Sequence, residues 1–351
     1  MFDPQIEADV NEILNEIRDH RIPPFGNILI TGANGMLASY IAESFLILKS
    51  KNEFQIGNIF LVGRKLSSDL DRLLNASNFG AVFVQLDTLG EFCSENQIDT
   101  FIHAASPSSF ERATLDFKSL FDTNLKLTDL LLEQIHSASN RFYFFSSGDV
   151  YGSSPKFPTG EKDFAACDPT ELRNLYGEFK RCAESLMKIY SETVKANYIS
   201  LRIYHTFGPG VNLEDGRIFS AILKSLKHRT QFLWNSNGTA KRNFLYSKDL
   251  FSAILYTSGV SGFNAYNVAG ARSISIRDFV SKAAEIGDSE LFPEPLPSDP
   301  NSVSHIQVGD ADTSKLQSMR WSQTVDEKQA LIRTLHSLEF RSSYQSKMLG
   351  I

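Results

Sequence analysis

The stretch T-G-A-N-G-M-L-A, residues 31–38, follows the apolar run NILI and leads into a segment with helical periodicity. Gly32 permits a tight turn, Gly35 lets the backbone approach a pyrophosphate closely, and the small Ala38 lets a helix pack closely on a strand. A helix that begins here presents free N–H groups and a positive dipole end to phosphate. The stretch therefore predicts a dinucleotide-binding loop; a tight strand–helix turn without a ligand is the alternative.

Short β-rich runs alternate with longer helical stretches from residue 26 to about residue 205. The runs are continuously apolar, which is typical of strands in a sheet covered on both faces. This alternation predicts an α/β fold with a Rossmann-type, doubly wound parallel sheet. After residue 205, shorter helices and loops rich in Gly, Pro and Asn predict a smaller C-terminal substrate-binding lobe over the carboxyl ends of the strands. The expected strands are 27–31, 58–63, 81–87, 100–106, 141–147 and 197–204.

The same pattern divides the chain into four parts. We expect an N-terminal helical extension (1–25), an NAD(P)-binding Rossmann domain (26–205), a substrate-binding lobe interleaved with it (206–340) and a tail (341–351). The acidic, helix-periodic N-terminal segment lacks the basic start and apolar core of a secretion signal.

Composition excludes several classes of protein. The chain has 351 residues, 42% hydrophobic and 22% charged, with a net charge of −6. These values are typical of a soluble globular protein and do not predict a nucleic-acid-binding protein. The apolar runs are too short and too often interrupted for membrane insertion. The three cysteines form no CxxC pair, so we expect neither a metal site nor a disulfide framework, and a reducing cytoplasm is the expected compartment.

The second expected strand ends in G-R-K-L-S-S, residues 63–68. A site for NAD usually offers Asp or Glu at this point, whereas the 2′-phosphate of NADP calls for Arg. Arg64 therefore slightly favours NADP over NAD. The alternative is that Arg64 is an exposed loop charge and that NAD is held by other contacts.

The stretch Y-G-E-F-K, residues 176–180, places Tyr176 and Lys180 on one face of an expected helix. A nearby ammonium favours phenolate over phenol, so we expect it to lower the pKa of the tyrosine. Such a base can take a proton from a sugar hydroxyl while hydride leaves the same carbon. An exposed pair is the alternative, but the order of motifs favours a site, because a strand ending in Ser146 and Ser147 lies between the phosphate loop and this helix.

With these motifs the chain resembles the extended short-chain dehydrogenases/reductases that modify nucleotide-sugars. The resemblance runs from about Gly26 to Leu335. It is carried by TGANGMLA, HAASPSS (103–109), FFSSGDVYG (144–152), YGEFKRCAE (176–184), LRIYHTFGPG (201–210), RNFLYSKDL (242–250) and DTSKLQSMRW (312–321). UDP-glucuronate decarboxylases are the most similar members in overall texture.

The resemblance implies roles for individual residues. Ser147 would hydrogen-bond the reacting hydroxyl or ketone, Tyr176 would be the base, and Lys180 would be its partner and hold the nicotinamide ribose. The implied cofactor-binding residues are Gly32, Asn34, Gly35, Met36, Arg64, Asp87, Thr88, Ala104, Ala105, Ser106, Lys180 and Tyr204. The implied substrate-binding residues are Ser108, Asn124, His205, Arg217 and Arg242, with Arg242 on the nucleotide diphosphate; no metal is implied.

Two departures from the family pattern bear on the reaction. The 4,6-dehydratases carry an Asp–Glu pair where this chain has Gly148 and Asp149, so the acid for eliminating water is missing, although Asp149 keeps a carboxylate. His205 stands where relatives carry Asn; it is either a phosphate ligand or extra acid, or a neutral packing residue. Ketoreduction or 4-epimerisation needs only Ser147, Tyr176 and Lys180 and is favoured. Decarboxylation of a UDP-glucuronate-like sugar, dehydration and binding without turnover remain alternatives.

The resemblance also implies a homodimer that pairs through the long helices around residues 115–137 and 169–194. Apolar side chains on these helices either supply that interface or face the sheet. They are Leu125, Leu130, Leu131, Ile135 and Leu186.

Overall fold

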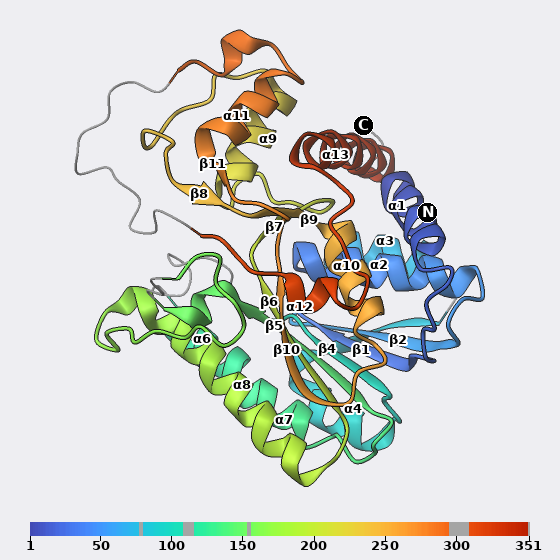
Figure 1. Cartoon of the computed structure of the whole chain (residues 1–351). Coiled ribbons are helices and arrows are strands. Elements are labelled where there is room, and N and C mark those ends of the chain that lie inside the picture. Colours follow the sequence, from blue (N-terminus) through green and yellow to red (C-terminus); the bar gives the residue numbers. More distant parts are fainter. Residues whose placement is uncertain (77–79, 108–115, 153–155, 295–308, 350–351) are drawn as a thin grey trace.

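The computed structural model describes residues 1–76, 80–107, 116–152, 156–294 and 309–349 (Figure 1). Its centre is a seven-stranded, all-parallel sheet in the order β10-β6-β5-β4-β1-β2-β3. The strands are β1 (Gly26–Thr31), β2 (Ile56–Gly63), β3 (Ala81–Gln85), β4 (Thr100–His103), β5 (Arg141–Ser147), β6 (Asn197–Ile203) and β10 (Gly262–Val268). The predicted doubly wound parallel sheet is confirmed.

Six of these strands lie where the sequence predicted them, although β3 and β4 end earlier, at Gln85 and His103. The seventh, β10, was not predicted. Its sequence GFNAYNV is only partly apolar, because it forms an edge strand that pairs with β6 alone. It therefore lacks the continuous apolar run that marks a strand in the middle of a sheet.

Helices cover both faces of the sheet (Figure 1). An apolar core lies on each face of the sheet, and the side chains of β1 alternate between the two. Leu29 packs in one core, and Ile28 and Ile30 pack in the other. The face of Leu29 packs against α4 (Leu89–Glu95), α7 (Leu127–Leu132) and α8 (Leu175–Thr193). The opposite face packs against α2 (Met36–Ser50), α3 (Ser68–Ala76) and α10 (Ser247–Tyr256). The short α6 (Phe117–Phe121) continues through a π-helical turn (Asp122–Lys126) into α7.

A third apolar core holds the elements that follow β6. Two short sheets, β7 (His205–Phe207) with β9 (Phe244–Tyr246) and β8 (Lys241–Arg242) with β11 (Ile274–Ser275), support it. Its helices are α9 (Ile218–His228), α11 (Ile276–Ala284) and α13 (Glu327–Leu349), whereas α12 (Ser314–Gln317) contacts β10 and buries Leu316 in the core of α2. α10 and β10 also follow β6 in the chain, but they join the layers of the main sheet.

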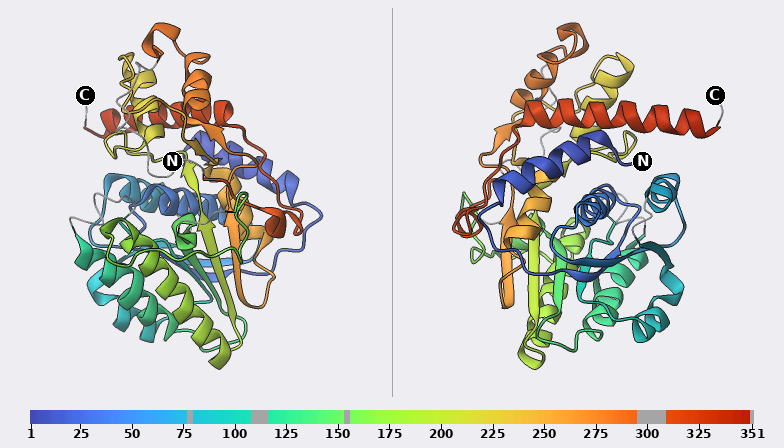
Figure 2. Two further views of the ribbon diagram at one scale, coloured as in Figure 1. Left: turned by 60° about the vertical axis from the view of Figure 1, so that its left-hand side comes forward. Right: turned by 90° about the vertical axis from the view of Figure 1, so that its right-hand side faces the viewer.

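The two ends of the chain pack together. The N-terminal helix α1 (Pro4–Glu16) contacts α2, α10 and α13, and α13 runs beside it (Figure 2). Ile6, Val10 and Ile13 of α1 are fully buried in the same core as α2. α13 continues through residue 341, so the segment expected to be a tail is helical through Leu349.

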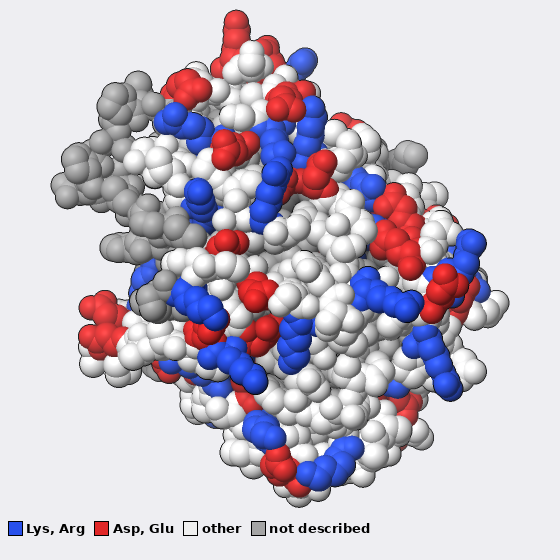
Figure 3. Space-filling model, in the orientation of Figure 1, with Lys and Arg blue, Asp and Glu red and all other residues white. Residues whose placement is uncertain are grey.

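On the face in Figure 3, acidic and basic side chains are interspersed. None of the helices in the described ranges is both long and apolar enough to cross a membrane. Within the same ranges, no group of three or more His, Cys, Asp or Glu side chains is placed to hold a metal ion.

Candidate active site

The phosphate loop joins β1 to α2 beside the point where the strand order reverses, between β1 and β4. Gly32 has φ +70°, and a Cβ there would lie 2.7 Å from the Cα of Ala105. Gly35 is the N-cap of α2 and makes no side-chain capping bond, so the first N–H groups of the helix point outward. This cradle of bare backbone fits a pyrophosphate, and Gly32, Gly35, Ala104 and Ala105 come together as predicted.

The adenosine side of the cradle is formed by the loops after β2 and β3. Asn34 Nδ2 donates to the Lys65 carbonyl oxygen (2.9 Å) and so ties the phosphate loop to the loop that carries Arg64. The Arg64 side chain is exposed. Asp87 and Thr88 are also exposed and lie on a 3₁₀ turn (Leu86–Thr88), not on the strand expected to run to residue 87. All three side chains are thus exposed just after the ends of β2 and β3.

The reacting end of the site lies where β5 ends. Ser147 Oγ accepts from the Asp149 N–H (3.2 Å) and donates to Asp149 Oδ2 (3.2 Å). Tyr176, in the first turn of α8, lies within reach of the hydroxyls of Ser106 and Ser147. Lys180 Nζ lies 5.6 Å from the centre of the Tyr176 ring. The structure therefore brings together the Ser, Tyr and Lys that the sequence predicted.

The predicted effect of Lys180 on Tyr176 is not seen. Burial, reinforced by the negative charge of Asp149, raises the pKa of Tyr176, while hydrogen bonding to Ser106 and Ser147 acts in the opposite direction. Burial lowers the pKa of Lys180 to about 7, and its Nζ donates to the Phe145 carbonyl oxygen (2.7 Å) rather than to the phenol. The two groups are thus both displaced toward their neutral forms. A positive charge brought by the cofactor would favour the phenolate.

The Asp149 side chain is accessible to solvent. Partial desolvation nevertheless raises the pKa of its carboxyl, while the hydrogen bond from Ser147 and the charges of Arg173 and Arg242 act in the opposite direction. A side chain on its neighbour Gly148 would meet the ring of Tyr204. A Cβ on Gly148 would lie 2.8 Å from Tyr204 Cζ. The Tyr204 ring therefore occupies the space that the dehydratase acid would need. Tyr204 was predicted to bind cofactor, and its position over Gly148 also places it beside the reacting groups.

Asn124 lies on the π-helical turn and is fully buried. Its Nδ2 donates to Ser106 Oγ (3.1 Å) and to the Leu120 carbonyl oxygen (2.9 Å). Through Ser106 the amide therefore connects to Tyr176. These bonds satisfy the amide NH₂ group of a fully buried asparagine. Ser108, which was also predicted to bind substrate, lies outside the described residues.

The lobe contributes the cationic part of the site. His205 is exposed on β7, and desolvation together with the positive charges of Arg242 and Arg217 lowers the pKa of its ring, which favours the neutral imidazole. Arg217 Nε donates to Asp215 Oδ2 (2.7 Å), so part of its charge is already paired. The charge of Arg173 acts on both Asp149 and Arg242, so Arg173 belongs to the same cationic cluster as Arg217 and Arg242. Arg173 was not among the predicted binding residues.

A buried network behind Ser147 escaped prediction. Glu184 Oε1 accepts from Ser146 Oγ (2.7 Å) and Ser200 Oγ (2.7 Å), and Oε2 accepts from Arg202 Nη2 (2.6 Å). Glu184 follows Tyr176 and Lys180 at successive intervals of four on α8, and this helical spacing was the signal for it in the sequence. The network fixes the end of β5 to α8.

The parallel sheet, the phosphate cradle and the Ser–Tyr–Lys group together form the arrangement typical of the short-chain dehydrogenase/reductase class. A match over residues 28–269 shows that the chain belongs to the NAD dependent epimerase/dehydratase family.

Named relatives within this family include UDP-glucuronic acid decarboxylase 1 of Xenopus tropicalis, 25% identical over 72% of this chain and 58% of that protein. UDP-glucuronic acid decarboxylase 1 of Arabidopsis thaliana is 25% identical over 92% of this chain and 72% of that protein. Among solved structures, UDP-glucuronic acid 4-epimerase from Bacillus cereus with UDP-glucuronic acid and NAD superposes with a TM-score of 0.71, at 20% identity over 90% of this chain and 99% of that one. The chain thus spans little more than half of the frog relative, and the structural likeness shows the fold.

Proposed function

We propose that the protein transfers hydride at C4 of the hexose of a nucleotide-diphosphate sugar, with 4-epimerisation as the net reaction. The observation that carries this proposal is the pairing of Gly148 with Tyr204 beside Ser147, Tyr176 and Lys180: the groups for hydride transfer are present, and the space for an eliminating acid is filled. Uridine diphosphate is the proposed nucleotide because the named relatives act on UDP-sugars.

Each residue has a defined part in this proposal. Tyr176 accepts the proton of the C4 hydroxyl, and Ser147 hydrogen-bonds the same oxygen. Lys180, once it is protonated, favours the phenolate form of Tyr176. The loop of Gly32 and Gly35 would hold NAD, which would supply the hydride acceptor and donor. Arg242, with Arg173 beside it, supports the diphosphate.

We propose NAD as the cofactor, because the chain belongs to the NAD dependent epimerase/dehydratase family. Net ketoreduction uses the same hydride transfer but suits a dissociable NADPH, so it is the less favoured reaction. Titration with NAD and NADP decides between them, and tighter NADP binding would restore Arg64 as a 2′-phosphate ligand.

Decarboxylation of a UDP-uronic acid is the second candidate. It is favoured by the named curated relatives and by Asp149, a carboxylate at the position where the decarboxylases carry Glu. Oxidation at C4 makes a β-keto acid that loses carbon dioxide without an acid at position 148, so the Gly148–Tyr204 contact does not oppose this reaction.

The test is incubation with UDP-glucose and with UDP-glucuronic acid in the presence of NAD, with products identified by mass and stereochemistry. Unchanged mass with inverted C4 supports the proposal, whereas loss of carbon dioxide supports the second candidate. We expect Tyr176→Phe to lower kcat by about 10²–10⁴-fold. Tyr190→Phe is the matched control, since Tyr190 lies on the same helix but its hydroxyl bonds Asp129 (3.0 Å). Full activity in Tyr176→Phe would show that Tyr176 is not the base and would contradict the proposed mechanism.

A further inference from the structure

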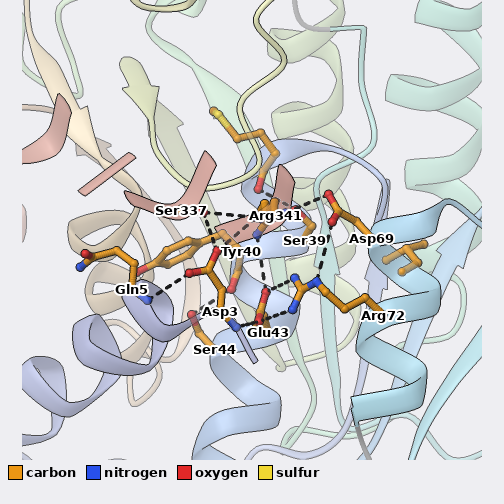
Figure 4. Close-up of polar contacts among 12 residues, drawn as sticks. Asp3, Gln5, Ser39, Tyr40, Glu43, Ser44, Asp69, Arg72, Ser337 and Arg341 are labelled. Carbon is orange, nitrogen blue, oxygen red and sulfur yellow. Dashed lines mark hydrogen bonds and ion pairs between the residues drawn. The ribbon is translucent and has the colours of Figure 1, made fainter. Parts of the chain in front are cut away.

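A single guanidinium, that of Arg341 on α13, connects the two ends of the chain to the Rossmann domain (Figure 4). Its Nη1 donates to Asp69 Oδ2 (2.8 Å), and its Nε donates to Asp3 Oδ2 (3.2 Å). Its Nη2 lies 3.5 Å from Glu43 Oε2. The side chain is only 7% exposed. Arg341 therefore joins α13 to the cap of α1, to α2 and to α3 at once.

A second buried arginine completes the network. Arg72 of α3 forms a bidentate pair with Glu43, with Nη1 to Oε1 at 2.8 Å and Nη2 to Oε2 at 2.7 Å. The backbone N–H of Asp3 donates to Glu43 Oε1 (2.6 Å). Glu43 thus receives both guanidinium groups and the start of α1. Removing one partner of a buried ion pair leaves the other charge uncompensated, which is strongly destabilising.

The network lies behind the adenosine–diphosphate half of the cofactor cradle. Glu43 is on α2, whose N-terminus forms the phosphate loop, and Asp69 is in the first turn of α3, directly after the loop of Arg64. The lobe reaches the same point. A Cβ on Gly210 would lie 3.4 Å from Arg341 Nη1 and 3.7 Å from Met36 Cα, so the 208–211 loop packs between Arg341 and the start of α2.

Asp3 and Arg341 both lie outside residues 28–269, the part of the chain that the family shares, whereas Glu43, Asp69 and Arg72 lie inside it. We propose that Arg341 is a positioning residue that slows cofactor release: it fixes α2, α3 and the 208–211 loop against one another around the adenosine–diphosphate half of the groove. Because groups already held in the bound arrangement need not be ordered again, the cofactor binds more tightly and leaves more slowly. This effect concerns the cofactor alone and holds whichever reaction occurs at the sugar.

The test is the dissociation rate of NADH from the full-length protein, followed by stopped-flow fluorescence well below the unfolding temperature. We expect Arg341→Met to release NADH about tenfold faster than the parent. Arg333→Met is the matched control: Arg333 lies on the same helix, and among the described residues its ion pairs are with Asp9 (2.8 Å) and Glu12 (2.9 Å), both on α1. The control should lose stability but release NADH at the parent rate.

Two results would overturn the proposal: parent-like release from Arg341→Met, or equally fast release from Arg333→Met, which would indicate a general loss of stability. If Arg341→Met does not fold, Asp69→Asn weakens only the link to α3 and should still accelerate release several-fold. An unchanged rate in that variant would likewise overturn the proposal.

Discussion

Lys180 carries an electrostatic cost that can be measured without substrate. Burial lowers its pKa from the usual 10.5 to about 7, so the folded state disfavours its charged form. Below pH 7 both folded and unfolded chains hold the proton, and the folded protein bears the whole cost. Between about pH 7 and pH 10 the unfolded chain binds more protons, so this contribution to the free energy of unfolding rises with pH.

We therefore expect Lys180→Met to be more stable than the parent at pH 6–7 and to lose that advantage as pH rises, by up to about 1.4 kcal/mol per pH unit. Urea unfolding at pH 6, 7 and 9 measures the difference, in which the titrations of other groups cancel. Parallel stability curves for the two proteins would show that Lys180 is not desolvated as the structure indicates.

Gly148 and Tyr204 form a second residue-scale test. A Cβ on Gly148 would lie 2.8 Å from Tyr204 Cζ and 3.0 Å from Tyr204 Cε1, so the ring must shift to accommodate alanine. We expect Gly148→Ala to reduce the free energy of unfolding by about 1–3 kcal/mol. In a Tyr204→Ala background the same substitution should cost much less, since the clashing ring is gone. Equal losses of stability in both backgrounds would show that the side chain at position 148 does not clash with Tyr204. For the same reason, Gly148→Asp alone should not gain dehydratase activity.

At the scale of elements, the Glu184–Arg202 pair holds the end of β5 against α8 and β6. Both side chains are buried, and Glu184 Oε1 also accepts from Arg202 Nε (3.0 Å). We expect Glu184→Gln to reduce the free energy of unfolding by about 3–5 kcal/mol, because it leaves the Arg202 charge without its buried partner. Chemical denaturation gives this value.

Glu178→Gln is its control, since Glu178 lies on the same helix and pairs with Arg181 at the surface (3.4 Å). That change should cost less than about 1 kcal/mol. A comparable loss in both variants would mean that any acidic residue on α8 matters equally.

The elements also show what the sequence could and could not predict. The central strands were predictable because each is a continuous apolar run, and the phosphate loop because glycine spacing reflects backbone geometry. β10 was not, since an edge strand needs fewer apolar residues. At the site, Ser147, Tyr176 and Lys180 followed from motif order. The reversed pKa shifts and the Tyr204 ring over Gly148 did not, because they depend on burial and on contacts between segments far apart in the sequence.

At the scale of the whole molecule, the remaining question is how two copies would meet. Of the apolar residues expected either at a dimer interface or on the sheet, Leu131 and Ile135 are buried in the core beneath α7, so they face the sheet. Leu125, Leu130 and Leu186 are only partly buried against that core. Larger exposed apolar side chains lie nearby, with Phe117 of α6 65% exposed and Ile189 of α8 62% exposed. We propose that α6, α7 and α8 form the dimer interface.

The charge of one side chain on this surface tests that proposal. A stable interface covers about 800 Å² per partner, and a carboxylate buried in it without a partner is strongly unfavourable. We therefore expect light scattering after gel filtration to give a dimer for the parent and a monomer for Ile189→Glu. Leu233→Glu should remain dimeric, because Leu233 is equally apolar and 76% exposed but lies in the lobe, away from these helices. A monomeric parent would contradict the proposed dimer. Dissociation by Leu233→Glu instead of Ile189→Glu would place the interface on the lobe.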